Sequence, residues 1–426
     1  MNEAAERARF ARARTGTFLA LVLGYVGYYL CRQNLAAAFA PLHDAQGIDH
    51  LTFGAIASVG TLAYAIGKLV TGPLADRFGG RGVFLVGLFG SALATLVLGA
   101  TGGVLTMLYV GWAANRVFQS MGWAGVVNVL PRWFPSTAYG AAIGGASISY
   151  QLGGVVATLF AGALLEAGLG WRGLFFVPAG ALVVIGLVAR PFLIGSPADV
   201  DLPLPPAAHD DISAHANSST PLSERLRRLI ARPSFLLLCA LSFVLTVVRE
   251  CLNVWTPAYF GSLGASAAGA AFKSAVFPLL GCAGTILAGW ISDRLGGRRG
   301  LVVSVMLGGL TLCLLALGRL DALASGSTRE WLAVVLIGLS GFLALGPYSM
   351  VGGGVCAVDA GGRELAATAA GLLDAVGYLG ASAAGIGIAG IVARWGWATA
   401  FLALGGLSTG GVALAVLIWR PRVPAR

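Results

Sequence analysis

Long apolar stretches separated by short polar ones run through the whole chain. A helix needs about 20 mostly apolar residues to cross a bilayer, and each stretch reaches or approaches that length. The pattern therefore predicts an all-α membrane protein with twelve transmembrane helices. We place them at residues 17–40, 52–74, 83–100, 104–130, 138–163, 173–194, 235–258, 267–292, 301–318, 331–356, 365–393 and 397–419.

The polar residues between these stretches are distributed unevenly. In the loops and at the ends of the apolar stretches, nineteen arginines fall on the side of the N-terminus and four on the other, and arginine-rich loops are typically cytoplasmic. We therefore expect both termini in the cytoplasm and the chain in a bacterial inner (plasma) membrane. One long segment rich in Pro, Ser and Asp predicts a cytoplasmic linker at 195–233, with a short amphipathic helix near 223–230. It separates six-helix halves at 1–194 and 234–426.

The two halves carry an internal repeat. The loop GPLADRFGGRG from Gly72 recurs as GWISDRLGGRRG from Gly289, so that Asp76 and Asp293 lie 217 positions apart. Arg32 and Arg249 have the same separation. Because both halves start on the same side, they are parallel repeats, and we expect a substrate site near the bilayer midplane where they meet.

The repeated loop resembles the signature that joins the second and third helices of major facilitator transporters. The resemblance implies a gating role, in which charged contacts hold the cytoplasmic side closed; a turn that only fixes topology is the alternative. The gating candidates are Asp76, Arg77, Arg81, Asp293, Arg294 and Arg298.

Composition excludes several other classes of protein. Mean hydropathy is +0.82 and only 11% of residues are charged, against roughly 25% in soluble domains. The net charge of +10 is dispersed among the loops, which favours membrane topology over nucleic-acid binding. The six cysteines show no CxxC or metal spacing. We expect no cofactor, no metal and no enzymatic activity, since no Ser-His-Asp set or GxxxxGK loop is present.

Arg32 is the most informative residue of the first apolar stretch. Placing arginine in hydrocarbon costs about 2.5 to over 10 kcal/mol, so it must face a cavity or a partner. Tyr25, Tyr28 and Tyr29 precede it by seven, four and three residues. Helical spacing predicts that they share its face.

The other charges inside apolar stretches are Lys68, Arg116, Arg249, Glu250, Lys273 and Asp374. Arg32 and Arg249 lie at similar depth, so two guanidinium groups can hold a doubly charged anion, of which phosphate fits best. Lys68 adds a third positive charge. The alternative is that these cations form buried ion pairs with Glu250 or Asp374, and for Arg116 and Lys273 a structural role is favoured. Asp374 is a proton site, a sugar-hydroxyl acceptor or, preferably, the ion-pair partner of an arginine.

Five stretches together resemble the organophosphate:phosphate antiporters of the major facilitator superfamily. They are GYVGYYLCRQNLAAAFAPL, YAIGKLVTGPLADR, GWAGVVNVLPRWF, VVRECLNVWTPAYF and GPYSMVGGGVCAVDAG with AAGLLDAVGYLGA. The resemblance covers nearly the whole chain. It implies exchange of an organic phosphate for inorganic phosphate by alternating access, with Arg32 and Arg249 on the phosphoryl group and Lys68 assisting. The last stretch is most similar to the sugar-phosphate exchangers.

One position departs from the family. Glycerol-3-phosphate transporters have a histidine in the fifth helix where this chain has Tyr150, followed by Gln151 in SYQLGG. A tyrosine can donate a hydrogen bond but does not carry the positive charge. A sugar phosphate such as glucose 6-phosphate is therefore favoured over glycerol 3-phosphate.

The expected protein is a monomeric antiporter whose partners are a phosphate ester, inorganic phosphate and the bilayer. Two alternatives stay open: a proton-coupled symporter for an organic carboxylate such as a hexuronate, and a transporter-like sensor of sugar phosphates. Trp123 and Asn253 are weaker binding candidates. The expected binding residues are Arg32, Arg249, Lys68, Tyr25, Tyr28, Tyr64, Tyr150, Gln151, Trp255, Asp374 and Tyr378.

Overall fold

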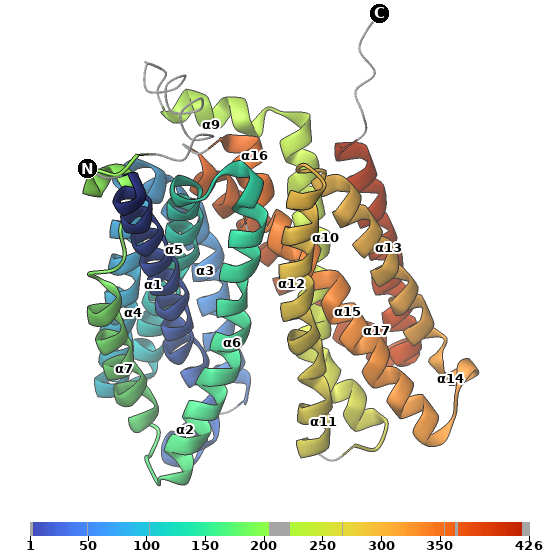
Figure 1. The fold of residues 1–426 in the computed structure, drawn as a ribbon. Coiled ribbons are helices and arrows are strands. Elements are labelled where there is room, and N and C mark those ends of the chain that lie inside the picture. Colours follow the sequence, from blue (N-terminus) through green and yellow to red (C-terminus); the bar gives the residue numbers. More distant parts are fainter. Residues whose placement is uncertain are drawn as a thin grey trace, which may run out of the picture. The chain divides into compact units, whose positions relative to one another are not determined.

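Helices make up nearly all of the computed structural model, which describes residues 3–48, 50–101, 103–203, 222–265, 267–352, 354–362 and 365–419 (Figure 1). The N-terminal helices are α1 (Glu3–Ala37), α2 (Phe39–Gln46), α3 (His50–Phe78), α4 (Gly80–Thr101), α5 (Leu105–Trp133), η1 (Ser136–Ala138), α6 (Tyr139–Glu166), α7 (Gly173–Ala189) and η2 (Pro197–Val200). The remaining helices are α9 (Leu222–Ile230), α10 (Pro233–Ser262), α11 (Ala267–Ser274), α12 (Val276–Arg294), α13 (Arg299–Gly318), α14 (Leu320–Leu323), α15 (Gly326–Val351), α16 (Val355–Gly361) and α17 (Ala366–Ile418).

Eight helical segments of the described chain are long and apolar enough to cross a membrane. The expected spans at 17–40, 104–130, 173–194 and 365–393 are helical but are not among these eight. Polar side chains lower the hydropathy of α5, where Asn115, Arg116 and Gln119 occur within five residues, and α7 has only 17 residues. The all-helical class is confirmed, and the count of twelve spans stays a prediction.

Two predicted features of the chain are present at the expected places. The amphipathic helix expected near 223–230 is α9, whereas most of the rest of the linker, 204–221, lies outside the described residues. The break expected between 393 and 397 is at Gly396, whose φ of 78° interrupts α17. Only glycine adopts this backbone conformation at little cost.

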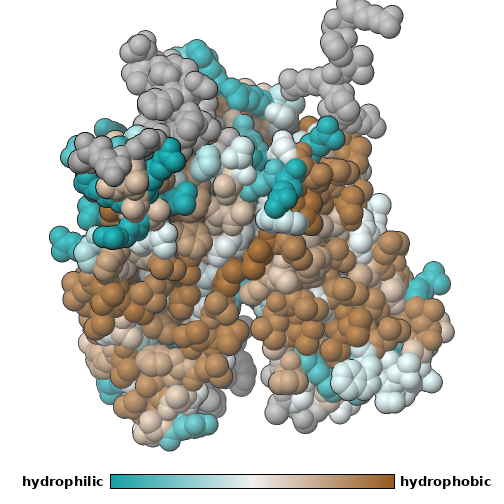
Figure 2. Space-filling model, in the orientation of Figure 1, coloured by the Kyte–Doolittle hydropathy of each residue, from teal (hydrophilic) through white to brown (hydrophobic). Residues whose placement is uncertain are grey.

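The helices form two compact units, and each unit is made of segments that are not consecutive in the chain. Unit 1 holds α1 to α5, α7, the part of α6 from Ile148 and the start of α17 up to Ala375. Unit 2 holds the start of α6, α9 to α16 and α17 from Val376. In each unit, hydrophobic side chains cover the middle of the visible face and hydrophilic ones gather near the ends (Figure 2). An apolar belt of this kind is what a bilayer requires.

Pairs of glycines bring helices close together in both units, and one such place in each unit lies at the start of a helix. In unit 1, a Cβ on Gly72 of α3 would lie 2.5 Å from the Ala367 carbonyl oxygen, and one on Gly371 would lie 2.4 Å from that of Lys68. In unit 2, a Cβ on Gly289 of α12 would lie 2.3 Å from the carbonyl oxygen of Gly140. Small residues allow such backbone contact between membrane helices. The starts of α17 and α6 are thereby held against α3 and α12.

Candidate functional site

Arg32 contacts two tyrosine rings in unit 1. Its Cζ lies 5.1 Å from the ring centroid of Tyr29 on α1 and 4.7 Å from that of Tyr64 on α3. Its Nη1 also donates a 3.4 Å hydrogen bond to the Tyr64 hydroxyl. Cation–π contact and hydrogen bonding replace part of the hydration that a buried guanidinium loses. The sequence-based expectation that Arg32 faces polar aromatic partners is met by Tyr29 and Tyr64.

Tyr64 is the centre of a larger charged group. Lys68 Nζ lies 5.2 Å and Arg116 Cζ 4.8 Å from its ring centroid, and Tyr64 is only 2% exposed. Lys68 Nζ also forms a 2.7 Å ion pair with Asp374 at the start of α17, where both side chains are almost fully buried. Asp374 therefore pairs with a lysine and not with an arginine, the partner that the sequence favoured. Three cations and one carboxylate give this Tyr64 cluster a formal charge of +2.

Tyr25 and Tyr28 pack beside Tyr29 on the same face of α1, with the ring centroid of Tyr25 5.8 Å from that of Tyr28 and 6.0 Å from that of Tyr29. The Tyr28 hydroxyl donates a 2.6 Å hydrogen bond to the Phe84 carbonyl oxygen, and its ring meets Phe84 edge-on. Tyr25 packs against Trp123, which in turn contacts the ring of Tyr150. The three tyrosine rings are therefore in contact with one another, but of the three only Tyr29 forms a cation–π contact with Arg32 in the described structure. Tyr28 thus has a hydrogen bond typical of a packing residue.

Two amides in unit 1 are buried without hydrogen bonds. Neither amide atom of Gln151, which is 8% exposed, has a partner among the described residues. The same holds for Asn34, which is 2% exposed and follows Arg32 by two residues. An unsatisfied buried amide is costly, and it is a feature that a polar ligand can compensate. Gln151 was expected at the binding site; Asn34 was quoted in the sequence motif but not named as a candidate.

Arg249 occupies an environment in unit 2 that parallels that of Arg32. Its Cζ lies 4.1 Å from the ring centroid of Tyr348 on α15 and 6.0 Å from that of Tyr378 on α17. Its Nη2 lies within 3.5 Å of the Tyr378 hydroxyl. Arg249 also forms an ion pair with Glu250, the alternative that the sequence left open. Each of the two equivalent arginines is therefore held between two tyrosines.

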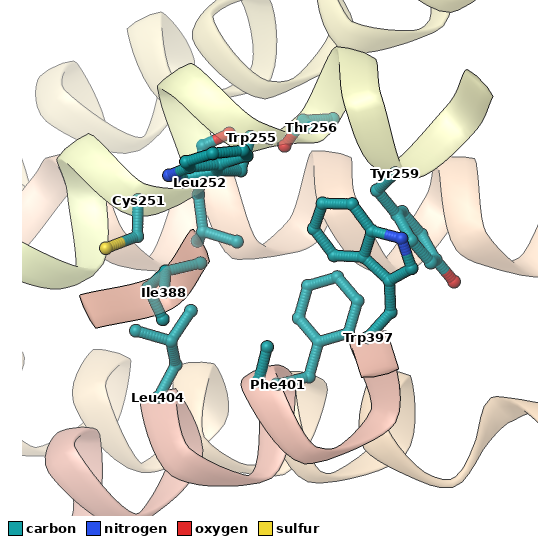
Figure 3. A pocket seen from close by; sticks show the side chains of 10 residues that line it. Cys251, Leu252, Trp255, Thr256, Tyr259, Ile388, Trp397, Phe401 and Leu404 are labelled. Carbon is teal, nitrogen blue, oxygen red and sulfur yellow. Dashed lines mark hydrogen bonds between the residues drawn. The ribbon is translucent and has the colours of Figure 1, made fainter. Parts of the chain in front are cut away.

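Trp255 lies in a separate aromatic group of unit 2. It is six residues after Arg249, which turns it about 120° around α10. It lines a cavity of about 10 Å³ together with Cys251, Leu252, Thr256, Tyr259, Ile388, Trp397, Ala400, Phe401 and Leu404 (Figure 3). A cavity of that size holds about one water and no phosphate ester. Trp255 Nε1 has no hydrogen-bond partner among the described residues.

The carboxylate of the first repeated loop caps a helix of its own unit. Asp76 at the end of α3 accepts hydrogen bonds from the Thr368 backbone N–H at 2.7 Å and hydroxyl at 2.6 Å, and from the Ala367 N–H at 3.3 Å. Asn128 of α5 donates a further bond of 3.0 Å to Asp76. Asp76 therefore satisfies the free N–H groups at the start of α17, where a negative charge is also favoured by the helix dipole.

The second loop repeats this arrangement in unit 2. Asp293 at the end of α12 accepts hydrogen bonds from the backbone N–H groups of Gly140 at 3.2 Å and Ala141 at 2.8 Å, at the start of α6. The arginines that follow contact neighbouring rings: Arg77 Cζ lies 5.2 Å from the Phe78 centroid, and Arg294 Cζ 4.9 Å from that of Trp290. Arg81 and Arg298 form no hydrogen bond or ion pair through their side chains with the described residues.

Several contacts of the charged groups were not anticipated from the sequence. Tyr348 makes the closest cation–π contact of Arg249, although only its motif GPYSMVGG had been singled out. Arg116, for which a structural role was favoured, contacts both Tyr64 and Trp112. Lys273 forms an ion pair with Glu330, in line with a structural role. In the sequence, Tyr348 could have been recognised as a candidate because it is a polar aromatic residue that follows Gly346 and Pro347 inside an apolar helix.

The described residues thus form a multi-helix protein with apolar helices long enough to cross a membrane and with buried charged groups inside them. Residues 21–385 and 262–426 match the family model described as Major Facilitator Superfamily, so the chain belongs to that family. A crystal structure of the major facilitator transporter FucP in the outward conformation covers 96% of this chain and all of its own chain. It matches with a TM-score of 0.73 at 15% identity, which supports the fold.

Three curated relatives match nearly the whole chain. A "Probable hexose phosphate transport protein" of Chlamydia pneumoniae is 26% identical over 95% of this chain and 90% of its own. A "Glycerol-3-phosphate transporter" of Bacillus subtilis is 28% identical over 93% and 90%. A "Membrane sensor protein UhpC" of Salmonella typhimurium is 28% identical over 96% and 92%. These names are consistent with the organophosphate:phosphate antiporter family. The matching family and its named relatives are not enzymes.

Proposed function

We propose that this protein exchanges an organic phosphate ester, preferably a sugar phosphate, for inorganic phosphate by alternating access. The observation that carries the proposal is the pair of repeat-related arginines, Arg32 and Arg249, each placed between two tyrosines. A guanidinium presents paired donors that fit phosphate oxygens. The relatives named hexose phosphate and glycerol-3-phosphate transporters support the substrate class.

In this proposal both arginines bind the phosphoryl group. Lys68 adds positive charge from the Tyr64 cluster, and Tyr64 and Tyr378 orient the two guanidinium groups. Gln151 and Asn34 hydrogen-bond the organic moiety, because their amides are buried and unsatisfied. Tyr25, Tyr150 and Trp255 are weaker members of the site, since each packs within an aromatic group.

The repeated loops are the proposed gate. Asp76 and Asp293 hold the starts of α17 and α6, and breaking these caps would release both helices during the transport cycle. Arg77, Arg81, Arg294 and Arg298 would contribute contacts at the same ends of the helices. We further propose that twelve spans cross a bacterial inner membrane, with cytoplasmic termini, and that the protein acts as a monomer.

Counterflow in reconstituted vesicles tests the proposal. Vesicles preloaded with inorganic phosphate should take up labelled glucose 6-phosphate, whereas empty vesicles should not. Arg32→Gln and Arg249→Gln should abolish uptake. Arg394→Gln alters an exposed arginine that belongs neither to the Tyr64 cluster nor to the contacts of Arg249. This control variant should retain uptake.

Other outcomes would identify a different function. Uptake that requires a proton gradient but no internal phosphate would indicate the carboxylate symporter. The sensor is a second candidate, because one relative with 28% identity is named a membrane sensor protein. Tight binding of glucose 6-phosphate without any flux in either direction would support it and refute exchange.

A further inference from the structure

Unit 1 has an apolar groove on its outer surface, away from the Tyr64 cluster. Its volume is about 510 Å³, within the range of about 300–1,000 Å³ found for ligand sites. Six of the seven lining residues are apolar, and the seventh is an arginine. The groove is lined by Leu85, Val86, Phe89, Gly90, Leu93, Phe118 and Arg190.

Helix α4 supplies most of the wall. Val86, Gly90 and Leu93 recur at helical spacing and form one stripe, and Val86 and Leu93 are 56% and 61% exposed. A Cβ on Gly90 would lie 2.3 Å from the Phe118 ring, so that ring packs directly on the backbone of α4. The stripe from Leu85 to Leu93 is about 12 Å long at 1.5 Å per residue. The groove is therefore elongated along the helix and apolar over its length.

Arg190 lies at one end of this groove. It follows the last residue of α7, and one turn before it Gly186 packs against Leu88 and Phe89 in the middle of α4. Arg190 is exposed, and its side chain forms no hydrogen bond or ion pair with any residue that the structure describes. The groove is open to the outside and thus combines an apolar surface with one exposed positive charge near the end of a membrane helix.

We propose that the groove binds an anionic phospholipid, with one acyl chain along α4 and the headgroup phosphate on Arg190. The walls offer no other charged or polar side chain, so a soluble anion would gain only the single contact with Arg190. A lipid gains that contact and also fills the apolar length. Arginine hydrogen-bonds phosphate through two donors, and anionic lipids are attracted to basic residues at the membrane surface. This inference is independent of the transported substrate.

Native mass spectrometry of the purified full chain tests this site. Phosphatidylglycerol and phosphatidylcholine with identical acyl chains are titrated in parallel. Wild type should prefer phosphatidylglycerol, and Arg190→Gln should lower that preference about fivefold, the factor expected for one basic residue at the membrane surface. Arg190→Lys should retain most of it. Arg132→Gln, at the end of α5 and outside the groove, should leave it unchanged.

A second variant examines the apolar part of the groove. Val86→Trp fills the channel and should reduce retention of both lipids, while the elution volume of the folded protein stays the same. Equal binding of the two lipids by wild type, or an unchanged preference in Arg190→Gln, would overturn the proposal. Displacement of phosphatidylglycerol by excess inorganic phosphate would also overturn it, since the site would then be an anion site and not a lipid site.

Discussion

Asp374→Asn would remove the carboxylate that accepts a hydrogen bond from Lys68. At the observed separation of 2.7 Å, the Coulomb attraction is about 6 kcal/mol for an effective dielectric constant of 20. Most of this offsets the cost of burying both charges. Removing one partner of a buried pair still costs about 3–5 kcal/mol, because the remaining charge is uncompensated. We therefore expect a clear fall in the thermal denaturation midpoint of the purified protein.

The same substitution should change substrate preference. It raises the formal charge of the Tyr64 cluster from +2 to +3, so a substrate with a third negative charge can compensate Lys68. A charge-assisted hydrogen bond contributes about 1.5–3 kcal/mol, which corresponds to a shift of at least about tenfold. The assay is inhibition of phosphate counterflow by glucose 6-phosphate and by 3-phosphoglycerate. Relative to wild type, the variant should be inhibited more strongly by 3-phosphoglycerate than by glucose 6-phosphate, by a factor of at least about ten.

A double variant separates the two effects. Lys68→Met with Asp374→Leu replaces the pair by apolar side chains and should restore most of the stability. It should not show the shift in substrate preference that is expected for Asp374→Asn, because that shift requires Lys68. If Asp374→Asn leaves both the denaturation midpoint and the inhibition ratio unchanged, Lys68 is neither paired with Asp374 nor near the bound phosphate, and the reasoning fails.

Three further substitutions test individual contacts. Tyr348→Leu should raise KM in counterflow by about two- to thirtyfold, since a cation–π contact contributes about 0.5–2 kcal/mol, whereas Tyr348→Phe should keep the ring and most of the affinity. Tyr28→Phe should lower the free energy of unfolding by about 1 kcal/mol through loss of the hydrogen bond to Phe84, with KM unchanged. Asp76→Ala should destabilise the protein by about 0.5–2 kcal/mol, as expected for loss of a helix cap at Thr368, measured as a lower denaturation midpoint.

Each of these expectations has a result that contradicts it. Equal KM values for the leucine and phenylalanine variants at Tyr348 would mean that its ring does not stabilise Arg249. A raised KM in Tyr28→Phe would place its hydroxyl at the substrate instead of at Phe84. An unchanged midpoint in Asp76→Ala would show that the start of α17 needs no cap from α3.

The sequence predicted the helical segments well because their signal is local. The apolar runs at 365–393 and 397–419 were expected as separate helices, and the structure interrupts α17 between them at Gly396. The charged contacts depended on tertiary structure. Lys68 and Asp374 are 306 residues apart, and nothing near either residue identifies the other. Helical spacing grouped Tyr28 with Arg32, but the direction of α4 decides that its hydroxyl meets Phe84.

The internal repeat carried more structural information than any single motif. A shift of 217 positions relates Gly72 to Gly289 and Asp76 to Asp293, and in each unit the glycine and the aspartate contact the start of the same neighbouring helix. The glycine allows a neighbouring backbone to approach, and the aspartate, one turn later, caps the helix that begins there. Neither residue would suffice alone, because a side chain at the glycine would hold the helix start beyond hydrogen-bonding distance of the carboxylate. Because the glycine and the aspartate recur together in both halves of the repeat, we infer that the close helix approach and the cap depend on each other. Substituting either glycine should therefore weaken the cap as much as substituting its aspartate.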